Sequence, residues 1–319
     1  MNRSEARIVS LLPSATEIVC AVGARERLVG RSHECDHPAG LDALPVLTRP
    51  RRRLPQASGD IDRTVREIVA EAIAVYEIDL PGLETTAPDV IVTQDLCDVC
   101  AVSLDDVREA LQEMARRDVE ICSLSPLRLA DVWADVRRVG RAVGHEGEGD
   151  EAAARLEARC EELAAATASF DRPKVLTIEW LDPVMIGGTW MPELVEISGG
   201  EPLVTKAGEH APTLDLEALR ALDPDIVVLK PCGFDVARTL EEAALFRTGL
   251  PWADWKAARV GEVYVADGNA YFNRPGPRLV ESAEILAAIL HPDAFPALVA
   301  RHGPGLRRIM PSGEARAFG

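Results

Sequence analysis

The chain has 319 residues, a formal net charge of -17, and 47% hydrophobic and 27% charged residues. This length allows two lobes with separate buried cores, and the composition is ordinary for a globular protein. Because a strongly negative surface repels phosphate backbones and anionic lipids, we expect no nucleic-acid partner and no membrane insertion. The composition indicates a soluble protein that handles small molecules.

An apolar segment near the N-terminus, residues 8–24 (IVSLLPSATEIVCAVGA), superficially resembles a signal peptide. Pro13 and Glu17 interrupt this segment, however, and bulky Val19 precedes Cys20 where lipoprotein processing requires a small residue. No other stretch approaches the roughly 18 consecutive apolar residues of a membrane-spanning helix. Seven cysteines, an odd number, fit a reducing compartment better than a disulfide framework. We therefore expect a cytoplasmic protein.

The first lobe is predicted to begin with a buried strand and a helix. Residues 7–12 (RIVSLL) predict the strand because they are mostly apolar. Ser14 is the predicted N-cap of the helix, with Glu17 as its capping-box partner and Gly23 at its end. Two further strands are predicted at residues 28–32 and 89–94.

The second half of the chain repeats a pattern of the first half. Residues 80–97 (LPGLETTAPDVIVTQDLC) and 216–233 (LEALRALDPDIVVLKPCG) both run through Pro-Asp into three apolar β-branched residues. The proline ends a helix and the apolar run predicts a strand buried on both faces. Strands that alternate with helices predict an α/β fold with mainly parallel sheets. The wide separation favours two similar lobes, although Pro-Asp at any helix-to-strand turn is the alternative.

Residues 128–170, between the lobes, predict helices. Apolar side chains recur at helical spacing in the first part, and residues 150–170 are rich in helix formers without glycine or proline. A helix of about 20 residues spans roughly 30 Å. We expect this helix to join two Rossmann-like lobes, residues 1–127 and 171–319, around a largely preformed ligand cleft at the strand ends.

The chain resembles the class III substrate-binding proteins of ABC importers, also called helical-backbone metal receptors. The segments that carry the similarity are RIVSLLPSATEIVCAVG, GRSHECDHP, APDVIVTQ, the interlobe helix, MPELVEISGG, LDPDIVVL and NAYFNRPGPRLVES. Members of this family carry vitamin B12, ferric siderophores, haem or metal ions. The chain is most similar to the vitamin B12-binding branch, because PSATE and SHECDHP resemble segments of that branch. The missing export signal is the departure from the family pattern.

The resemblance implies that loops of both lobes contact the ligand. In the first lobe the implied residues are Pro13, Ser14, His33, Glu34 and Gln94. In the second lobe they are Tyr271, Asn273, Arg274 and Arg278. Glu34 stands where the vitamin B12 branch has an aromatic residue, so the ligand surface has changed. Arg274 is suited to bidentate hydrogen bonds with an amide or carboxylate; alternatively, the neighbouring prolines shape a helix start and the arginines are solvated.

Aromatic and sulfur-containing side chains gather around a Gly-Gly turn in the second lobe. Trp180, Trp190 and Met191 flank this turn, and aromatic residues make up only 4% of the chain. Their clustering favours a pocket in which flat indoles stack on a broad ligand. For each tryptophan alone, burial in the core is the equal alternative.

The loop SHECDHP carries alternating metal-binding residue types. In an extended chain His33, Cys35 and His37 share one side, and imidazole with thiolate suits a borderline metal such as zinc. The alternative is a polar loop in which Asp36 caps a turn.

Cys97 and Cys100 follow a predicted strand at Cys-x-x-Cys spacing. Structural zinc needs further ligands, which Cys35 and His33 would have to supply, with an iron–sulfur cluster as another occupant. Two other interpretations remain open, namely pocket-lining residues beside the ligand and a dithiol redox pair.

We expect no enzyme, because the sequence contains no Gly-rich phosphate loop, nucleophile elbow or His-Glu-x-x-His helix. The favoured function is a cytoplasmic binding protein for a metal chelate, preferably a cobalamin-like corrinoid or related tetrapyrrole. The alternative is a metalloprotein or enzyme whose zinc or iron–sulfur centre uses Cys35, Cys97, Cys100 and His33. A third hypothesis is a delivery protein that docks on an unknown protein acceptor.

Overall fold

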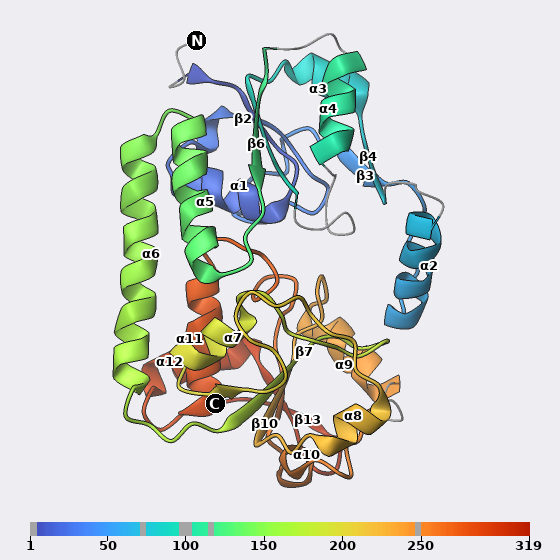
Figure 1. Ribbon diagram of the computed structural model, residues 1–319, viewed down its shortest axis with the longest axis vertical. Coiled ribbons are helices and arrows are strands. Elements are labelled where there is room, and N and C mark those ends of the chain that lie inside the picture. Colours follow the sequence, from blue (N-terminus) through green and yellow to red (C-terminus); the bar gives the residue numbers. More distant parts are fainter. Residues whose placement is uncertain (1–4, 71–74, 96–103, 114–117, 246–249) are drawn as a thin grey trace. The chain divides into compact units, whose positions relative to one another are not determined.

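The computed structural model describes residues 5–70, 75–95, 104–113, 118–245 and 250–319. The chain divides into two compact units. Unit 1 comprises Met1–Gln56, Arg63–Pro126 and Ala130–Glu157. Unit 2 comprises Ala57–Asp62, Leu127–Leu129 and Ala158–Gly319. Each unit combines a sheet with helices (Figure 1), which confirms the α/β class predicted from the sequence.

Unit 1 is built on a parallel sheet. Its described strands, in spatial order, are β2 (Leu28–Arg31), β1 (Ile8–Ser10), β5 (Val90–Gln94) and β6 (Glu120–Leu124). All three residues of β1 are buried, as expected for a strand paired on both sides in a sheet whose faces are covered. The three strands predicted for this lobe are therefore confirmed. A separate antiparallel pair consists of β3 (Thr48–Pro50) and β4 (Tyr76–Ile78).

Helices flank this sheet in chain order. They are α1 (Pro13–Ala21), α2 (Ser58–Ala70), α3 (Leu80–Thr86), α4 (Leu104–Glu113) and α5 (Leu129–Ala142), with a short 3-10 helix at Arg25–Arg27. Apolar residues from the strands and from α3 and α4 form one buried cluster, which includes Val9, Ile91 and Val107. This core fixes the strand ends that carry the polar loops.

The start of α1 differs from the prediction. Leu12 is the N-cap and Pro13 occupies the first turn, while the Ser14 side chain makes no capping hydrogen bond. The predicted Ser14 cap is wrong because proline, with its fixed φ and missing N–H, suits the first helical position. The predicted end is confirmed, since Gly23 has a φ of 78° just beyond the helix.

The long helix α6 (Glu146–Thr167) has 22 residues. It starts before residue 150 and includes Gly147 and Gly149, which lie ahead of the glycine-free stretch 150–170 noted in the sequence. A Cβ added to Gly140 in α5 would lie 2.9 Å from the Cα of Gly149. The two glycines therefore allow α5 and α6 to pack closely. Residues of α6 up to Glu157 belong to unit 1 and the rest to unit 2.

Unit 2 contains a larger sheet. Its described strands run in the order β13 (Ala315–Ala317), β12 (Arg307–Ile309), β11 (Val263–Val265), β10 (Ile226–Leu229), β7 (Lys174–Trp180) and β8 (Met185–Ile186), with β9 (Glu201–Pro202) also paired to β7. Strands β11, β10, β7 and β9 are mutually parallel. All four residues of β10 are buried, which confirms the strand predicted after the second Pro-Asp.

The helices of unit 2 cover this sheet. They are α7 (Met191–Ile197), α8 (Leu216–Ala221), α9 (Val236–Leu245), α10 (Lys256–Val260), α11 (Leu279–Leu290) and α12 (Pro296–His302), followed by a 3-10 turn at Gly303–Gly305. Helix α11 packs against α7 and α12, and Glu284 of α11 pairs with Arg159 of α6 and His302 of α12. Unit 2 is thus tied together by ion pairs as well as by apolar packing.

The segment Ala57–Asp62 belongs to unit 2 although unit 1 residues precede and follow it. The buried carboxylate of Glu242 accepts hydrogen bonds from the Ser58 backbone N–H at 3.2 Å and from the Ser58 hydroxyl at 2.8 Å. A Cβ on Gly59 would overlap the Asp182 carboxylate. The first turn of α2 is therefore fixed on unit 2, a feature that the sequence pattern did not indicate.

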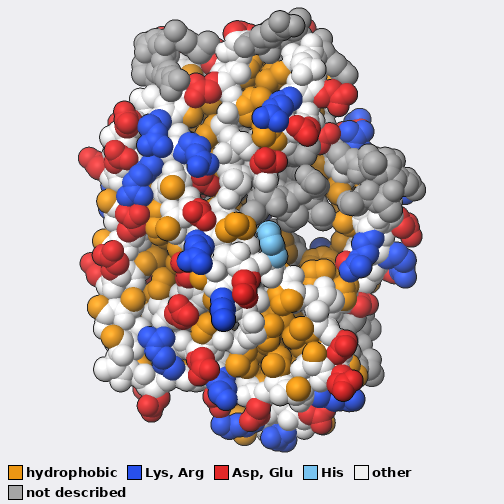
Figure 2. All heavy atoms as spheres, viewed as in Figure 1, with side chains coloured by type: hydrophobic (Ala, Val, Ile, Leu, Met, Phe, Trp, Pro, Cys, Tyr) orange, Lys and Arg blue, Asp and Glu red, His pale blue; other side chains and the backbone are white. Residues whose placement is uncertain are grey.

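Charged side chains of both signs are interspersed on the face seen in Figure 2, where Lys and Arg form no single patch among the coloured residues. Among the described helices, none is both long and apolar enough to cross a membrane.

Candidate functional site

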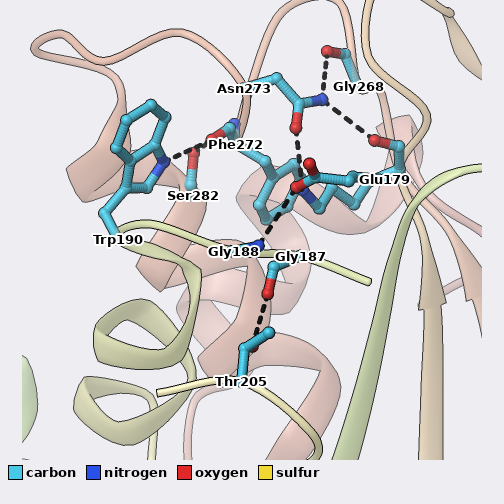
Figure 3. A network of polar contacts seen from close by, with 10 residues as sticks. Glu179, Gly187, Gly188, Trp190, Thr205, Gly268, Phe272, Asn273 and Ser282 are labelled. Atoms are coloured by element: carbon cyan, nitrogen blue, oxygen red, sulfur yellow. Dashed lines mark hydrogen bonds and ion pairs between the residues drawn. The ribbon is translucent and has the colours of Figure 1, made fainter. Parts of the chain in front are cut away.

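The carboxyl ends of the parallel strands in unit 2 carry a polar cluster. Trp180 ends β7, Lys230 directly follows β10, and Asn273 lies in the loop after β11. Ligands of α/β folds bind at this edge of a parallel sheet. The cluster in Figure 3 is therefore the candidate ligand site of unit 2.

Lys230 is the centre of this cluster, and its side chain is 0% exposed. Its ammonium donates hydrogen bonds to Glu179 Oε2 at 3.1 Å and to Asn273 Oδ1 at 2.8 Å. Asn273 Nδ2 in turn donates to the backbone oxygens of Lys230 and Gly268, at 3.0 and 2.8 Å. A buried ammonium requires such partners because its desolvation is costly. The network holds three separate chain segments in one arrangement.

Two glycines allow the backbone to approach this network closely. A Cβ on Gly268 would overlap the carbonyl oxygen of Pro231, and a Cβ on Gly188 would overlap the backbone of Ala211. The Gly188 N–H points to Glu179 Oε2 at 3.4 Å (Figure 3). The Gly-Gly turn noted in the sequence thus supports the carboxylate of Glu179.

Phe272 holds the loop of Asn273 in an uncommon conformation. Its φ is 67°, a left-handed value that costs about 1–3 kcal/mol for a residue with a side chain. Trp190 Nε1 donates to the Phe272 carbonyl at 2.7 Å, and the Phe272 N–H donates to Ser282 Oγ at 2.9 Å. Trp190 is only 5% exposed. Trp190 therefore supports the site loop from within, and its predicted stacking on a ligand stays a prediction.

The other predicted residues of this lobe differ in exposure. Trp180 and Tyr271 are partly exposed, and the Arg278 guanidinium lies 5.5 Å from the Tyr271 ring centroid. Arg274 is nearly buried, and its Nη2 donates to Asn269 Oδ1 at 2.9 Å. Met191, at the start of α7, is also buried. The two partly exposed aromatic rings are the best placed to meet a ligand.

Sequence reasoning missed Glu179 and Lys230. Glu179 lies near the end of the mostly buried strand β7, in IEW, and Lys230 directly follows the apolar strand β10, in VVLK. A charge in that position is rarely buried unless it is paired, so the combination was an available signal. The residues that contact Glu179 and Lys230, however, lie in chain segments that only the fold brings together.

Unit 1 presents neutral polar groups after β2. The hydroxyl of Thr48 accepts from the His33 backbone N–H at 3.1 Å, contacts His33 Nδ1 at 2.8 Å, and donates to Ser32 Oγ at 3.0 Å. The His33 ring lies against Tyr76, with centroids 5.2 Å apart. Burial lowers the pKa of His33. This part of unit 1 is therefore a hydrogen-bonded cluster of uncharged groups at neutral pH.

The remaining predicted residues of unit 1 lie near the same sheet edge. Glu34 Oε1 accepts from the Tyr76 hydroxyl at 3.4 Å. Pro13 is partly exposed, whereas Ser14 and Gln94 are 1% and 6% exposed. The buried Ser14 hydroxyl oxygen has no hydrogen-bond partner among the residues that the structure describes. Their roles as ligand contacts stay predictions.

The metal-binding interpretation of SHECDHP assumed an extended chain, and that assumption is wrong. The Cys35 N–H donates to the Ser32 carbonyl at 3.2 Å, so the chain turns at this point. Cys35 is buried and its Sγ accepts from the Thr16 hydroxyl at 3.0 Å, whereas His37 is exposed. The alternating side chains therefore do not share one side.

Cys97 and Cys100 lie outside the described residues. The site that joins them to Cys35 and His33 therefore stays a prediction, as do the zinc and iron–sulfur occupants. Within the described part of the chain, no group of three or more His, Cys, Asp or Glu side chains is placed to hold a metal ion.

A cavity of about 800 Å³ lies elsewhere in unit 2. It is lined by α9, residues 250–254, α10 and the β12–β13 hairpin, and it reaches Val263, the first residue of β11. It therefore opens at the amino ends of the parallel strands, opposite the polar cluster. We place the candidate site at the polar cluster because the buried Lys230 ammonium, Glu179 and Asn273 are brought together there at the carboxyl ends of the strands.

Comparison with known proteins gives the family. The family described as "Periplasmic binding protein" matches residues 8–270, which is most of the chain. The chain belongs to the periplasmic binding protein family. It is thus a substrate-binding protein and not an enzyme, as the sequence predicted.

A curated relative of this periplasmic binding protein is the uncharacterized ABC transporter substrate-binding lipoprotein YvrC of Bacillus subtilis (strain 168). It is 23% identical over 302 residues, which cover 92% of this chain and 83% of the relative. A periplasmic heme binding protein from Pseudomonas aeruginosa has 22% identity and a TM-score of 0.66 over 90% of this chain and 93% of its own. The periplasmic vitamin B12 binding protein BtuF of Vibrio cholerae has 20% identity and a TM-score of 0.60 over 91% and 98%. These similarities confirm the predicted two-lobe α/β fold.

Proposed function

We propose that this protein binds a planar metal chelate of the tetrapyrrole class, with a cobalamin-like corrinoid as the preferred ligand. Structures with this fold are named for heme and for vitamin B12. The observation that carries the proposal is the polar cluster of unit 2 (Figure 3), together with the partly exposed Trp180, next to Glu179 in the chain, and the partly exposed Tyr271, two residues before Asn273. Ligand sites combine apolar walls with a few well-placed polar groups in this way.

Binding, rather than turnover, is the proposed mechanism. The aromatic faces of Trp180 and Tyr271 pack against the macrocycle, because such rings bury large area and stack with offset geometry. Polar groups at the strand ends pair with the substituents around the macrocycle edge. The network of Lys230 and Asn273 keeps this surface in place before the ligand arrives, which lowers the entropic cost of binding.

We further propose that the protein works in the cytoplasm and passes its ligand to a protein acceptor, with an ABC transporter as a candidate partner. Residues 8–21, which superficially resemble a leader, form the buried strand β1 and helix α1, so their removal would destroy the sheet of unit 1. Among the described residues, Cys20, Cys35, Cys122, Cys160 and Cys232 form no disulfide with one another, which suits a reducing compartment. Cell fractionation of the full chain tests the location, and recovery in the membrane or secreted fraction would contradict it.

The binding proposal is tested by titrating the purified protein with cyanocobalamin and with hemin, following the visible bands and tryptophan fluorescence. We expect saturable binding with quenching, and weakening by about tenfold in Trp180→Leu, which loses roughly one stacking contact. Trp252→Leu is the matched control, because Trp252 lines the cavity at the opposite sheet edge. Absence of binding for both chelates, or equal weakening by both substitutions, would contradict the proposal.

A further inference from the structure

We propose that Glu179, held from beneath by Lys230, makes the site of unit 2 selective for a chelate whose edge carries amides rather than carboxylates. This inference rests on the proposed function, since it names the class of chelate that the same site takes.

The two carboxylate oxygens of Glu179 have different surroundings. Oε2 accepts from the Lys230 ammonium at 3.1 Å and from the Gly188 N–H at 3.4 Å. Among the described residues, none donates a hydrogen bond to Oε1, and the side chain is 25% exposed. The carboxylate is therefore fixed through one oxygen, while the other carries no hydrogen bond in Figure 3.

The neighbours of Glu179 have little hydrogen-bonding capacity left for a ligand. Asn273 uses both amide hydrogens on backbone carbonyls and its oxygen on Lys230. Lys230 is fully buried, so its ammonium does not reach a ligand. Asn273 and Lys230 are consequently positioning residues, and Glu179 Oε1 is the acceptor that the cluster offers.

An ionised carboxylate accepts hydrogen bonds and donates none, whereas a primary amide has two N–H donors. An amide at the chelate edge thus pairs with Oε1. A carboxylate at the same position brings two acceptors of like charge together, which leaves both unpaired and repelling. Selectivity then comes from rejection of the wrong edge as much as from attraction of the right one.

Arg278 is the group that opposes this selectivity. Its guanidinium stands near Tyr271 and is suited to bind carboxylates. Because Glu179 is fixed by two donors, the buried Lys230 ammonium and the Gly188 N–H, we expect Glu179 to dominate at its own position. The experiment must therefore change only Glu179 and keep the arginines.

The test uses two corrinoids that share one ring and one metal, dicyanocobinamide with an amide edge and dicyanocobyrinic acid with a carboxylate edge. For the unmodified protein, we expect tighter binding of the amide form by about tenfold or more, the size expected for one mismatched polar contact. Glu179→Gln keeps an oxygen for Lys230 but supplies an N–H2 group, so the preference should fall to within about threefold. Glu179→Asp keeps the charge but withdraws it by one methylene, and should also lower the preference.

Asp254→Asn is the matched control. It removes the same unit of charge from unit 2 at the cavity on the opposite sheet edge, and should leave the preference unchanged. Equal affinity of the unmodified protein for both corrinoids, or a preference that Glu179→Gln leaves intact, overturns the selectivity while the proposed function stands. Failure of both corrinoids and of hemin to bind overturns the proposed function as well.

Discussion

The two sheets end in polar clusters of different chemistry. In unit 1, Thr48 joins His33 and Ser32 through hydrogen bonds between neutral groups. In unit 2, Lys230 is buried as an ion and depends on Glu179. A neutral hydrogen bond contributes about 1 kcal/mol net to stability, whereas an ion left buried without its partner costs about 3–5 kcal/mol. The same α/β arrangement therefore carries two clusters that differ in sensitivity. Loss of one partner should cost little stability in the neutral cluster of unit 1 and more in the ionic cluster of unit 2.

The largest effect is expected for Glu179→Leu, which leaves the Lys230 ammonium buried without its counter-charge. The free energy of unfolding should fall by about 3 kcal/mol, at the lower end for a buried pair because Glu179 is partly exposed. Lys230→Met should cost much less, because the remaining carboxylate is reached by solvent. Urea unfolding of both variants and of the double variant measures this asymmetry. Equal losses in the two single variants would show that burial of Lys230 is not the deciding factor.

Acid should weaken unit 2 through Glu284. Burial raises the pKa of this carboxyl, but hydrogen bonds from His302 and Arg159, with the charges of Arg159 and Arg301, outweigh burial and lower it to about 2. A depressed pKa stabilises the fold above the unfolded value of about 4.5, and this contribution is lost as pH falls toward 2. Allowing for solvent screening, we expect a loss of about 2 kcal/mol. Glu284→Gln should remove this part of the pH dependence in thermal unfolding; an unchanged acid slope would contradict the assignment.

Unit 1 should show the opposite sign through Asp135. Burial raises the pKa of this carboxyl to about 6, against the lowering effect of Arg138. The folded state then holds a proton that the unfolded state has released, so stability is highest below about pH 4 and declines as pH rises through 6. The decline should be about 2 kcal/mol at most, since Arg138 relieves the charge. Asp135→Asn should flatten the stability profile between pH 4 and 6, and a profile that keeps its slope would count against Asp135.

The smallest effect is expected for Thr48→Val, which keeps the shape of the buried side chain and removes its hydroxyl. The His33 backbone N–H and the Ser32 hydroxyl lose a partner, at a cost of about 1–2 kcal/mol. Thr85→Val is the control, because the Thr85 hydroxyl bonds the Pro81 carbonyl at an exposed position. A loss for Thr48→Val as large as that for Glu179→Leu would remove the distinction between the two clusters.

Much of the fold was predictable because strands β1, β5 and β10 are short apolar runs bounded by turn residues. A strand that is buried on both faces needs apolar residues at successive positions, so it can be recognised in the sequence as a short apolar run. The polar network of unit 2 was not predictable in this way. Glu179, Lys230 and Asn273 come from three segments whose meeting depends on strand order, and the sequence carries no local sign of that order.

Local conformation limited the remaining site predictions. The alternation of His33, Cys35 and His37 indicates one shared side only in an extended chain, and the turn at Ser32 removes that condition. Phe272 has a left-handed φ without being glycine, so its conformation is imposed by Trp190 and Ser282 rather than by its own preference. A local turn thus decided the first position, and tertiary contacts decided the second.

The contact between Ser58 and Glu242 has a consequence for synthesis of the chain on the ribosome. The two residues are 184 positions apart, so at about 5–20 residues per second the start of α2 waits roughly ten to forty seconds for its acceptor. During that time the N-terminal portion can fold only with this turn unattached. A gene fragment that begins at residue 158 encodes most of unit 2 but lacks its residues 57–62 and 127–129, leaving the Glu242 carboxylate without the Ser58 donors. Supplying residues 57–62 in trans, or grafting them ahead of residue 158, would restore these donors in a separately produced unit 2.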